Sequence, residues 1–265
     1  MNELKRWILP VIVLVAALSD PVFGKEIPRG KPLAYGLSVD RLERIDRLMA
    51  DAVAAGFAVG GRAVIARQGH VVYEHNFGLK NREADETITA DTIFRIYSMT
   101  KPVAGVALLM LYEEGRFMLN DPVARYLPEL ADLQVAVATA DGNAEAEPGA
   151  IREPGRQPTI RDLMRHTAGF TYGIFGNSPV DKLYRDARLF QADNLAEFVK
   201  ILGTLPLQYE PGSRWHYSVS VEVQSRLVEV LSGMSFAEFL NSRLFTPLDM
   251  RDTHFVLPAD KHDRL

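Results

Sequence analysis

The segment from Met99 to Glu114 constrains the fold of this chain more than any other. It reads MTKPVAGVALLMLYEE, and the residues from Val103 to Leu111 include no charged side chain. A helix that is apolar on all sides is a buried helix, so we expect this segment to form an internal helix that ends at Gly115. Pro102 then lies in the first turn, where its missing N–H costs little.

Ser98 and Lys101 stand where this helix begins, and residues three apart there project from one face of an α or 3₁₀ turn. Serine is a poor nucleophile unless a base takes its proton. Lysine is a poor base at its ordinary pKa of ~10.4. Loss of hydration lowers a lysine pKa, and we expect the buried helix to have this effect on Lys101. The spacing alone is a weak indication, and a solvated lysine in a first helical turn is the simpler alternative.

Longer segments around these residues resemble one enzyme superfamily. TIFRIYSMTKPVAGVALLMLYEEGRFMLNDPVARYLPEL resembles the nucleophile region of the serine β-lactamases and penicillin-binding proteins, including their Ser-x-x-Lys motif. TIRDLMRHTAGF is similar to the next landmark, a helix ending in His-Thr-Ser/Ala-Gly, and YEPGSRWHYS is similar to the third. The landmarks follow the family's order from about Ser38 to Leu265. The resemblance implies an α+β fold, in which an antiparallel sheet with flanking helices adjoins an all-helical region and the nucleophile lies between them.

The early part of the chain fits that expectation. Apolar spacing predicts a helix over 38–55. Two β-like runs, 61–67 and 70–78, flank Gln68-Gly69 and predict a hairpin. The resemblance puts the remaining strands and a final helix at the end of the fold, yet no Lys-Thr-Gly or His-x-Gly strand occurs before Leu265. We therefore expect a chain truncated at its C-terminus.

The resemblance also assigns roles to residues. Ser98 is the expected nucleophile and Lys101 its base, and Tyr217 is expected to relay the proton to the leaving group. A buried aromatic at a loop-to-helix junction is the plainer interpretation of Tyr217. The backbone N–H of Ser98 is expected to form half of the oxyanion hole, whose second donor would come from an absent strand. His166 is interpreted as structural, a helix-end side chain that bonds nearby backbone.

One departure from the family pattern separates its branches. β-Lactamases of this type usually carry Tyr-x-Asn, with the asparagine binding the substrate amide, whereas this chain has Tyr217-Ser218-Val219. Valine cannot form that bond, which favours the esterase-like branch that resembles class C β-lactamases and includes acyltransferases of the lovastatin type. The residues predicted to shape the substrate pocket are Tyr97, Tyr172, Trp215 and Val219, although Tyr97, Tyr172 and Trp215 could equally be core residues.

Composition excludes several classes of function. The chain has 265 residues, a formal net charge of −4 and no cysteine. Disulfides, thiolate metal sites and cysteine nucleophiles are therefore excluded. Dispersed Lys and Arg argue against a nucleic-acid partner. The histidines show no metal-binding spacing, and we expect neither a metal nor an organic cofactor. The sequence does not indicate an oligomeric state.

The N-terminus has the features of a secretory signal. Lys5 and Arg6 precede an apolar stretch, 7–18, that is too short for a comfortable membrane span, and a small residue, Gly24, marks a cleavage site. We expect residues 1–24 to be removed and residues 25–265 to form the hydrolase domain, working in the periplasm or outside the cell without a stable membrane anchor. An uncleaved anchor is the alternative.

Three functional hypotheses follow. The first is an exported serine hydrolase that cleaves small-molecule carboxylic esters through an acyl-enzyme on Ser98. The second is a β-lactamase or D-Ala-D-Ala carboxypeptidase. The third is a non-catalytic truncated fragment or binding module that keeps the landmarks without the active-site strand.

Overall fold

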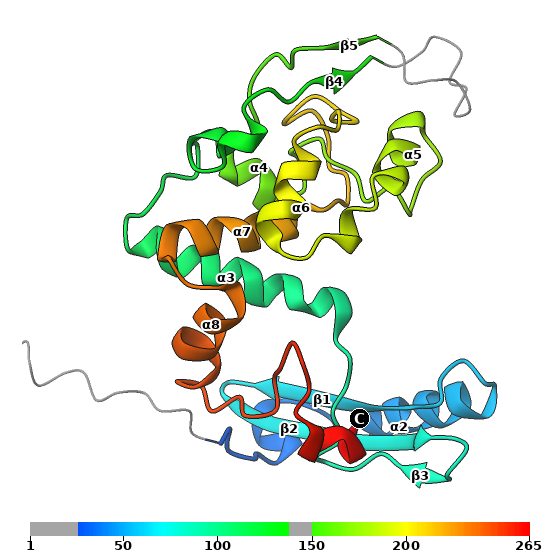
Figure 1. Ribbon diagram of the computed structural model, residues 1–265. Coiled ribbons are helices and arrows are strands. Elements are labelled where there is room, and N and C mark those ends of the chain that lie inside the picture. Colours follow the sequence, from blue (N-terminus) through cyan, green and yellow to red (C-terminus); the bar gives the residue numbers. More distant parts are fainter. Residues whose placement is uncertain (1–25, 138–149) are drawn as a thin grey trace, which may run out of the picture. The chain divides into compact units, whose positions relative to one another are not determined.

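The computed structural model describes residues 26–137 and 150–265, so the predicted signal segment, 1–24, lies outside the described residues. The predicted hydrolase domain is built from two compact bodies. Residues 26–95 and 245–265 form the first, and residues 96–244, without 138–149, form the second. Figure 1 shows their elements, and each body is described by itself.

The first body is a small antiparallel sheet with a helix beside it. Its elements are η1 (Pro32–Tyr35), α2 (Val39–Ala54), β1 (Gly60–Arg67), β2 (His70–Asn81), β3 (Glu86–Thr87) and η7 (Ala259–Arg264). The strands pair in the order β1-β2-β3, and Arg67 pairs with His70. Gln68 and Gly69 both have positive φ, 50° and 74°, as a two-residue type I′ turn requires. The predicted hairpin is confirmed.

Helix α2 confirms the helix predicted over 38–55 and packs against β2 (Figure 1). The Tyr73 hydroxyl on β2 donates a hydrogen bond of 2.6 Å to Asp46 Oδ1 on α2. The last residues of the chain belong to the same body, because the Ile93 N–H donates to the Arg264 carbonyl at 2.7 Å. Arg264 also pairs with Asp252 at 2.6 Å, which holds η7 in place.

The second body is helical around α7 (Ser220–Ser232), which packs along α3 (Thr100–Glu113) in Figure 1. Its other elements are η2 (Tyr97–Met99), η3 (Val123–Arg125), η4 (Pro128–Leu130), β4 (Val135–Ala136), β5 (Ile151–Arg152), α4 (Ile160–Met164), α5 (Pro179–Asp186), η5 (Leu189–Gln191), α6 (Leu195–Leu202), α8 (Phe236–Leu240) and the π-helical turn η6 (Asn241–Phe245), whose last residue belongs to the first body. Helices α3, α4, α6, α7 and α8 all contribute fully buried side chains, including Leu108, Leu111, Leu163, Leu202, Leu227 and Phe239.

Helix α3 forms where the sequence predicts it, but the expectation that it is buried on all sides is wrong. Ala104, Ala107, Leu108 and Leu111 are buried, whereas Val106 is 44% exposed and Leu109 is 41% exposed. Both apolar side chains are therefore left uncovered within the described part of the helical body. The composition of a helix shows that it has apolar faces, and only the fold shows which of them are covered.

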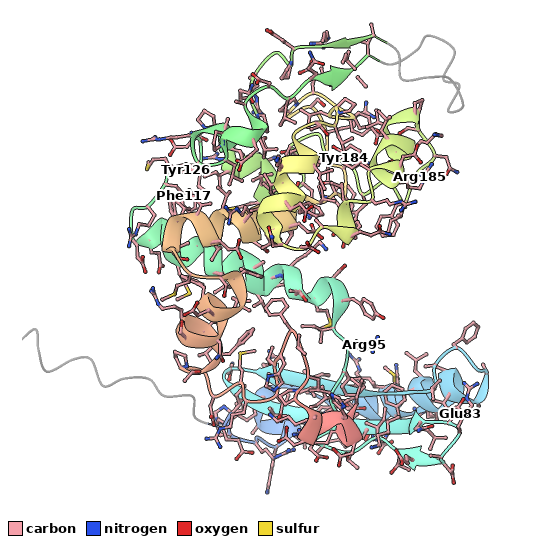
Figure 2. All side chains as sticks on the ribbon, viewed as in Figure 1. Glu83, Arg95, Phe117, Tyr126, Tyr184 and Arg185 are labelled. Carbon is pink, nitrogen blue, oxygen red and sulfur yellow. The ribbon has the colours of Figure 1, made fainter. Side chains whose placement is uncertain are left out.

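Two polar networks hold the loops that lead to the site. A capping box joins Thr159 and Asp162 at the start of α4, and Arg156 pairs with the buried Asp162 at 2.6 Å. Arg156 and the Thr159 and Thr167 hydroxyls hold the pKa of Asp162 at about 2, although burial raises it. At α5, where Figure 2 labels Tyr184 and Arg185, Arg185 donates to the carbonyls of Gly173 and Gly176. These contacts anchor the loop that carries Tyr172.

Candidate active site

Ser98 and Lys101 lie on one side of the turn that opens α3. The chain enters this turn through Tyr97, whose φ of +42° is uncommon for a residue with a side chain. The 3₁₀ turn Tyr97–Met99 then continues directly into α3. Lys101 Nζ donates to Ser98 Oγ at 3.3 Å, as the spacing of three residues predicts.

Tyr217 completes a hydrogen-bonded triad with these two residues. Its hydroxyl lies 2.6 Å from Ser98 Oγ, although 119 positions separate them in the sequence. Lys101 Nζ lies over the Tyr217 ring, 4.7 Å from its centroid. Ser98 and Tyr217 are therefore in direct contact, and Lys101 is next to both. This is the grouping expected from the sequence.

The loop that carries Tyr217 is held against the segment that follows α4. Gly169 has a φ of +95°, and a Cβ there would come within 2.1 Å of the Tyr209 carbonyl oxygen, so only glycine fits. The Gly212 N–H donates to Thr167 O at 2.7 Å, and the His216 N–H donates to His166 O at 2.8 Å. These bonds hold both ends of the turn that presents Tyr217.

His166 contacts the Tyr217 ring and the backbone of the next residue, Ser218. Its Nδ1 accepts a hydrogen bond of 3.3 Å from the Ser218 backbone N–H, so this nitrogen carries no proton. Burial lowers its pKa, and the nearby Lys101 charge lowers it further, which favours a neutral ring. The ring centroid lies 5.1 Å from that of Tyr217. This geometry agrees with the structural role predicted for His166.

Tyr172 adds a second phenol to the site. Its oxygen accepts a hydrogen bond of 3.3 Å from Lys101 Nζ, and its hydroxyl donates to Glu222 Oε1 at 2.7 Å. The ring stacks on Tyr217 with centroids 5.3 Å apart. Tyr172 was predicted to line an apolar pocket, but its hydroxyl belongs to a polar network with Lys101 and Glu222.

The two phenols have opposite electrostatic environments. Burial raises the pKa of Tyr217, but hydrogen bonds with Lys101 and Ser98 and the Lys101 charge outweigh that effect, so its pKa lies below the ordinary value. Burial and the Glu222 carboxylate raise the pKa of Tyr172 far above its ordinary value. Neighbouring groups with pKa values shifted in opposite directions are typical of acid–base sites. Tyr217 is suited to exchange a proton, whereas Tyr172 stays protonated.

The predicted pocket residues have different outcomes. Tyr97 is 77% exposed and Trp215 is 65% exposed, so both are open to a ligand, and their contact with substrate stays a prediction. Val219 is completely buried at the start of α7, so the prediction that it lines the pocket is wrong. Its side chain packs into the core of the helical body and has no surface left for a substrate.

Three site residues were missed by the sequence analysis. Glu222 lies in the first turn of α7, where an acidic residue is common for helix-dipole reasons alone. Phe175 lies in a loop and Phe190 in η5, and their rings pack on Tyr172 with centroids 5.6 Å and 5.8 Å away. Glu222 is the third residue of α7, and the sequence contains no signal that separates it from other acidic residues in a first helical turn. Within the described residues no group of three His, Asp or Glu side chains could hold a metal ion.

A serine, an amine and a phenol of lowered pKa thus meet at the start of a helix, and sequence comparison identifies the family to which the chain belongs. The Beta-lactamase family profile matches residues 45–265, so the chain belongs to that family of serine hydrolases. Among curated relatives, esterase EstB of Burkholderia gladioli is 34% identical over 229 residues, which are 85% of this chain and 54% of EstB.

Solved structures agree with this assignment. EstCE1, a hydrolase with promiscuous acyltransferase activity, is 28% identical with a TM-score of 0.63, covering 78% of this chain and 51% of its own. A class C beta-lactamase has a TM-score of 0.63 at 16% identity, covering 84% of this chain and 53% of its own. The predicted β-lactamase-like α+β fold is confirmed. The chain spans about half the length of these relatives.

Proposed function

We propose that this protein cleaves small-molecule carboxylic esters through an acyl-enzyme on Ser98. The observation that supports the proposal most strongly is the position of Ser98 Oγ, 2.6 Å from the Tyr217 hydroxyl and 3.3 Å from Lys101 Nζ. A serine activated by an adjacent base is the requirement for nucleophilic catalysis at an acyl carbon.

The chemistry requires one proton to move twice in each of two half-reactions. As Ser98 Oγ bonds to the ester carbonyl carbon, its proton passes to the Tyr217–Lys101 pair. The same proton then passes to the oxygen of the leaving alcohol as the ester C–O bond breaks. Water or a second alcohol attacks the acyl-enzyme, gives its proton to the pair, and releases the acyl group while the proton returns to Ser98. The lowered pKa of Tyr217 supports its role in each transfer.

The choice of esters rests on two further observations. The relative EstB is named an esterase, and EstCE1 is described as a hydrolase with acyltransferase activity. In addition, Val219 occupies the position where lactam-cleaving relatives carry an amide-binding asparagine, and its buried side chain cannot bind a substrate amide.

A comparison of two chromogenic substrates tests the proposal. We expect the protein to hydrolyse p-nitrophenyl butyrate and Ser98→Ala to lose that activity, with little turnover of nitrocefin by either. Fast nitrocefin turnover without ester cleavage would instead identify a β-lactamase or carboxypeptidase. Labelling with a fluorophosphonate probe tests the third hypothesis. A well-folded chain that is not labelled at Ser98 would be a non-catalytic binding module.

We also propose that the protein is exported and acts in the periplasm or outside the cell. The support is the sequence of residues 1–24 alone. Over residues 26–137 and 150–265, no helix has the length and hydropathy to cross a bilayer. Expression in a bacterium followed by fractionation and N-terminal sequencing tests the proposal. We expect a mature N-terminus at Lys25, and a full-length chain retained in the cytoplasm would contradict it.

A further inference from the structure

Glu222 is connected to the proposed catalytic groups by two hydrogen bonds, which pass through Tyr172. Its Oε1 accepts from the Tyr172 hydroxyl at 2.7 Å, and the Tyr172 oxygen accepts from Lys101 Nζ at 3.3 Å. Glu222 and Tyr172 are both half-buried, and Oε2 of Glu222 is buried with no partner among the described residues. The site therefore continues from Ser98 through Lys101 and Tyr172 to a carboxylate.

The number of hydrogens on each group fixes the direction of every hydrogen bond between Ser98 and Glu222. A phenol has one hydrogen, and a carboxylate can only accept, so the Tyr172 hydrogen points at Glu222. The lone pairs of the Tyr172 oxygen are then left to accept from Lys101. Lys101 Nζ is held between this oxygen and Ser98 Oγ, with acceptors at 3.3 Å on both sides. Without the carboxylate the Tyr172 hydrogen would be free to turn toward other acceptors.

We propose that Glu222 is a positioning residue, which acts through Tyr172 to aim Lys101 Nζ at Ser98 Oγ and places a negative charge beside the Lys101–Tyr217 pair. The proposal rests on the function proposed above for Ser98. Glu222 has no hydrogen bond with Ser98, Lys101 or Tyr217 themselves. Its effect is transmitted through one phenol and through its charge.

The charge effect has a definite sign. The groups that face Tyr217 are Lys101 and Ser98 from the turn and first residues of α3, Tyr172 and His166 from the segment after α4, and Glu222 from α7. The Lys101 charge lowers the pKa of Tyr217, and the Glu222 charge raises it. Removing the Glu222 charge should therefore let Tyr217 ionise at lower pH.

Nuclear magnetic resonance of tyrosine labelled with ¹³C at Cζ tests this without any need for turnover. The full chain is compared with Glu222→Gln, and Tyr217→Phe assigns the Tyr217 signal. Glu113→Gln is the matched control, because it removes the same charge about 18 Å along α3 from Lys101 at 1.5 Å per residue. We expect the Tyr217 midpoint to fall in Glu222→Gln and to stay in place in Glu113→Gln. An unchanged or higher midpoint in Glu222→Gln, or an equal shift in both variants, overturns the charge effect.

Labelling kinetics with a fluorophosphonate probe test the positioning effect. Tyr172→Phe removes the bridging oxygen but keeps the ring, and we expect a loss of about 3- to 10-fold in the labelling rate, the value of one hydrogen bond. Measured above the Tyr217 midpoint, Glu222→Leu, which removes the acceptor of the Tyr172 hydrogen, should slow labelling in the wild-type background and have no further effect in the Tyr172→Phe background. Independent, additive losses would overturn the relay.

Two controls keep the outcomes separate. Far-ultraviolet circular dichroism and urea unfolding establish that each variant is folded, and Glu222→Asp, which keeps the charge, should retain the wild-type Tyr217 midpoint. If the wild-type chain is not labelled at Ser98, the proposed function fails, and the tyrosine titration alone decides the inference about Glu222.

Discussion

Tyr172 and Tyr217 stack with ring centroids 5.3 Å apart, and the same lysine contacts both rings. Burial and Glu222 hold the proton on Tyr172, whereas Lys101 and Ser98 make the proton of Tyr217 easier to lose. Two chemically identical side chains therefore have pKa values shifted in opposite directions, because one bonds to a carboxylate and the other to a serine next to an amine.

The first prediction concerns the phenol of Tyr217. Tyr217→Phe removes the group 2.6 Å from Ser98 Oγ while it keeps the stacked ring. We expect ester hydrolysis and fluorophosphonate labelling to fall about 10²- to 10⁴-fold, the range for loss of a general acid–base group. Tyr112→Phe, on the opposite end of α3, serves as the control and should keep its rate. Full labelling of Tyr217→Phe would remove this residue from the mechanism.

The pH dependence of labelling gives the second prediction. The pKa of Tyr217 lies below its ordinary value, and the phenolate that accepts the Ser98 proton is populated only above that lowered pKa. The rate constant should therefore rise with pH, level off before about pH 10, and fall as the pH drops through the Tyr217 pKa. Lys101→Met removes the hydrogen bond and the charge that lower this pKa, so the rise should move to higher pH. A profile that Lys101→Met leaves in place would contradict the assignment.

A third prediction concerns the network that supports the site. Asp162 caps α4 and pairs with Arg156. Asp162→Ala should reduce the free energy of unfolding by about 1–3 kcal/mol, because it leaves buried donors without an acceptor. The matched control is Asp132→Ala, at an exposed position, which should change little. Urea unfolding of both variants at pH 7 measures the difference.

The same carboxylate predicts how stability depends on pH. The folded-state pKa of Asp162 is about 2, below the value near ~3.9 of an unfolded chain. Its contribution is therefore complete above the unfolded value and is lost as the pH falls toward 2. The difference in unfolding free energy between wild type and Asp162→Ala should be smaller at pH 3 than at pH 7. An equal difference at both values would show that the carboxylate charge is not responsible.

The fifth prediction concerns Phe175, which is 70% exposed while its ring packs on Tyr217 at 5.7 Å. An exposed ring beside the nucleophile provides an apolar surface for an acyl chain. Phe175→Ala should raise KM for p-nitrophenyl butyrate about fivefold, equivalent to ~1 kcal/mol, and have less effect on p-nitrophenyl acetate. Phe57→Ala removes a ring that is 89% exposed in the first body and should leave both KM values unchanged. Equal effects on the two esters would exclude an acyl contact.

Much of this site was predictable because its groups are adjacent in sequence or lie in recognisable segments. Ser98 and Lys101 are one turn apart, so helix geometry alone brings them to one side. Tyr217 is distant in sequence, and only the resemblance of its segment to a known family suggested the contact. The hairpin was predictable from Gln68-Gly69 between two β-like runs, since local turn geometry fixes the pairing.

What could not be predicted depends on tertiary packing. Nothing in the sequence distinguishes Glu222 from any acidic residue in a first helical turn, and its role becomes visible only through its bond to Tyr172. Val219 was assigned from its place in a motif, but the fold turns its side chain into the core. The expected effect of burial on Lys101 stays a prediction, because α3 leaves part of its apolar surface uncovered.

The backbone bonds from Gly212 to Thr167 and from His216 to His166 have a practical consequence. They join the segment after α4 to the loop before α7, so the contact of Tyr217 with Ser98 at the start of α3 depends on the folding of the helical body. We therefore expect a covalent probe of this serine to report the fraction of molecules in a sample whose helical body has folded.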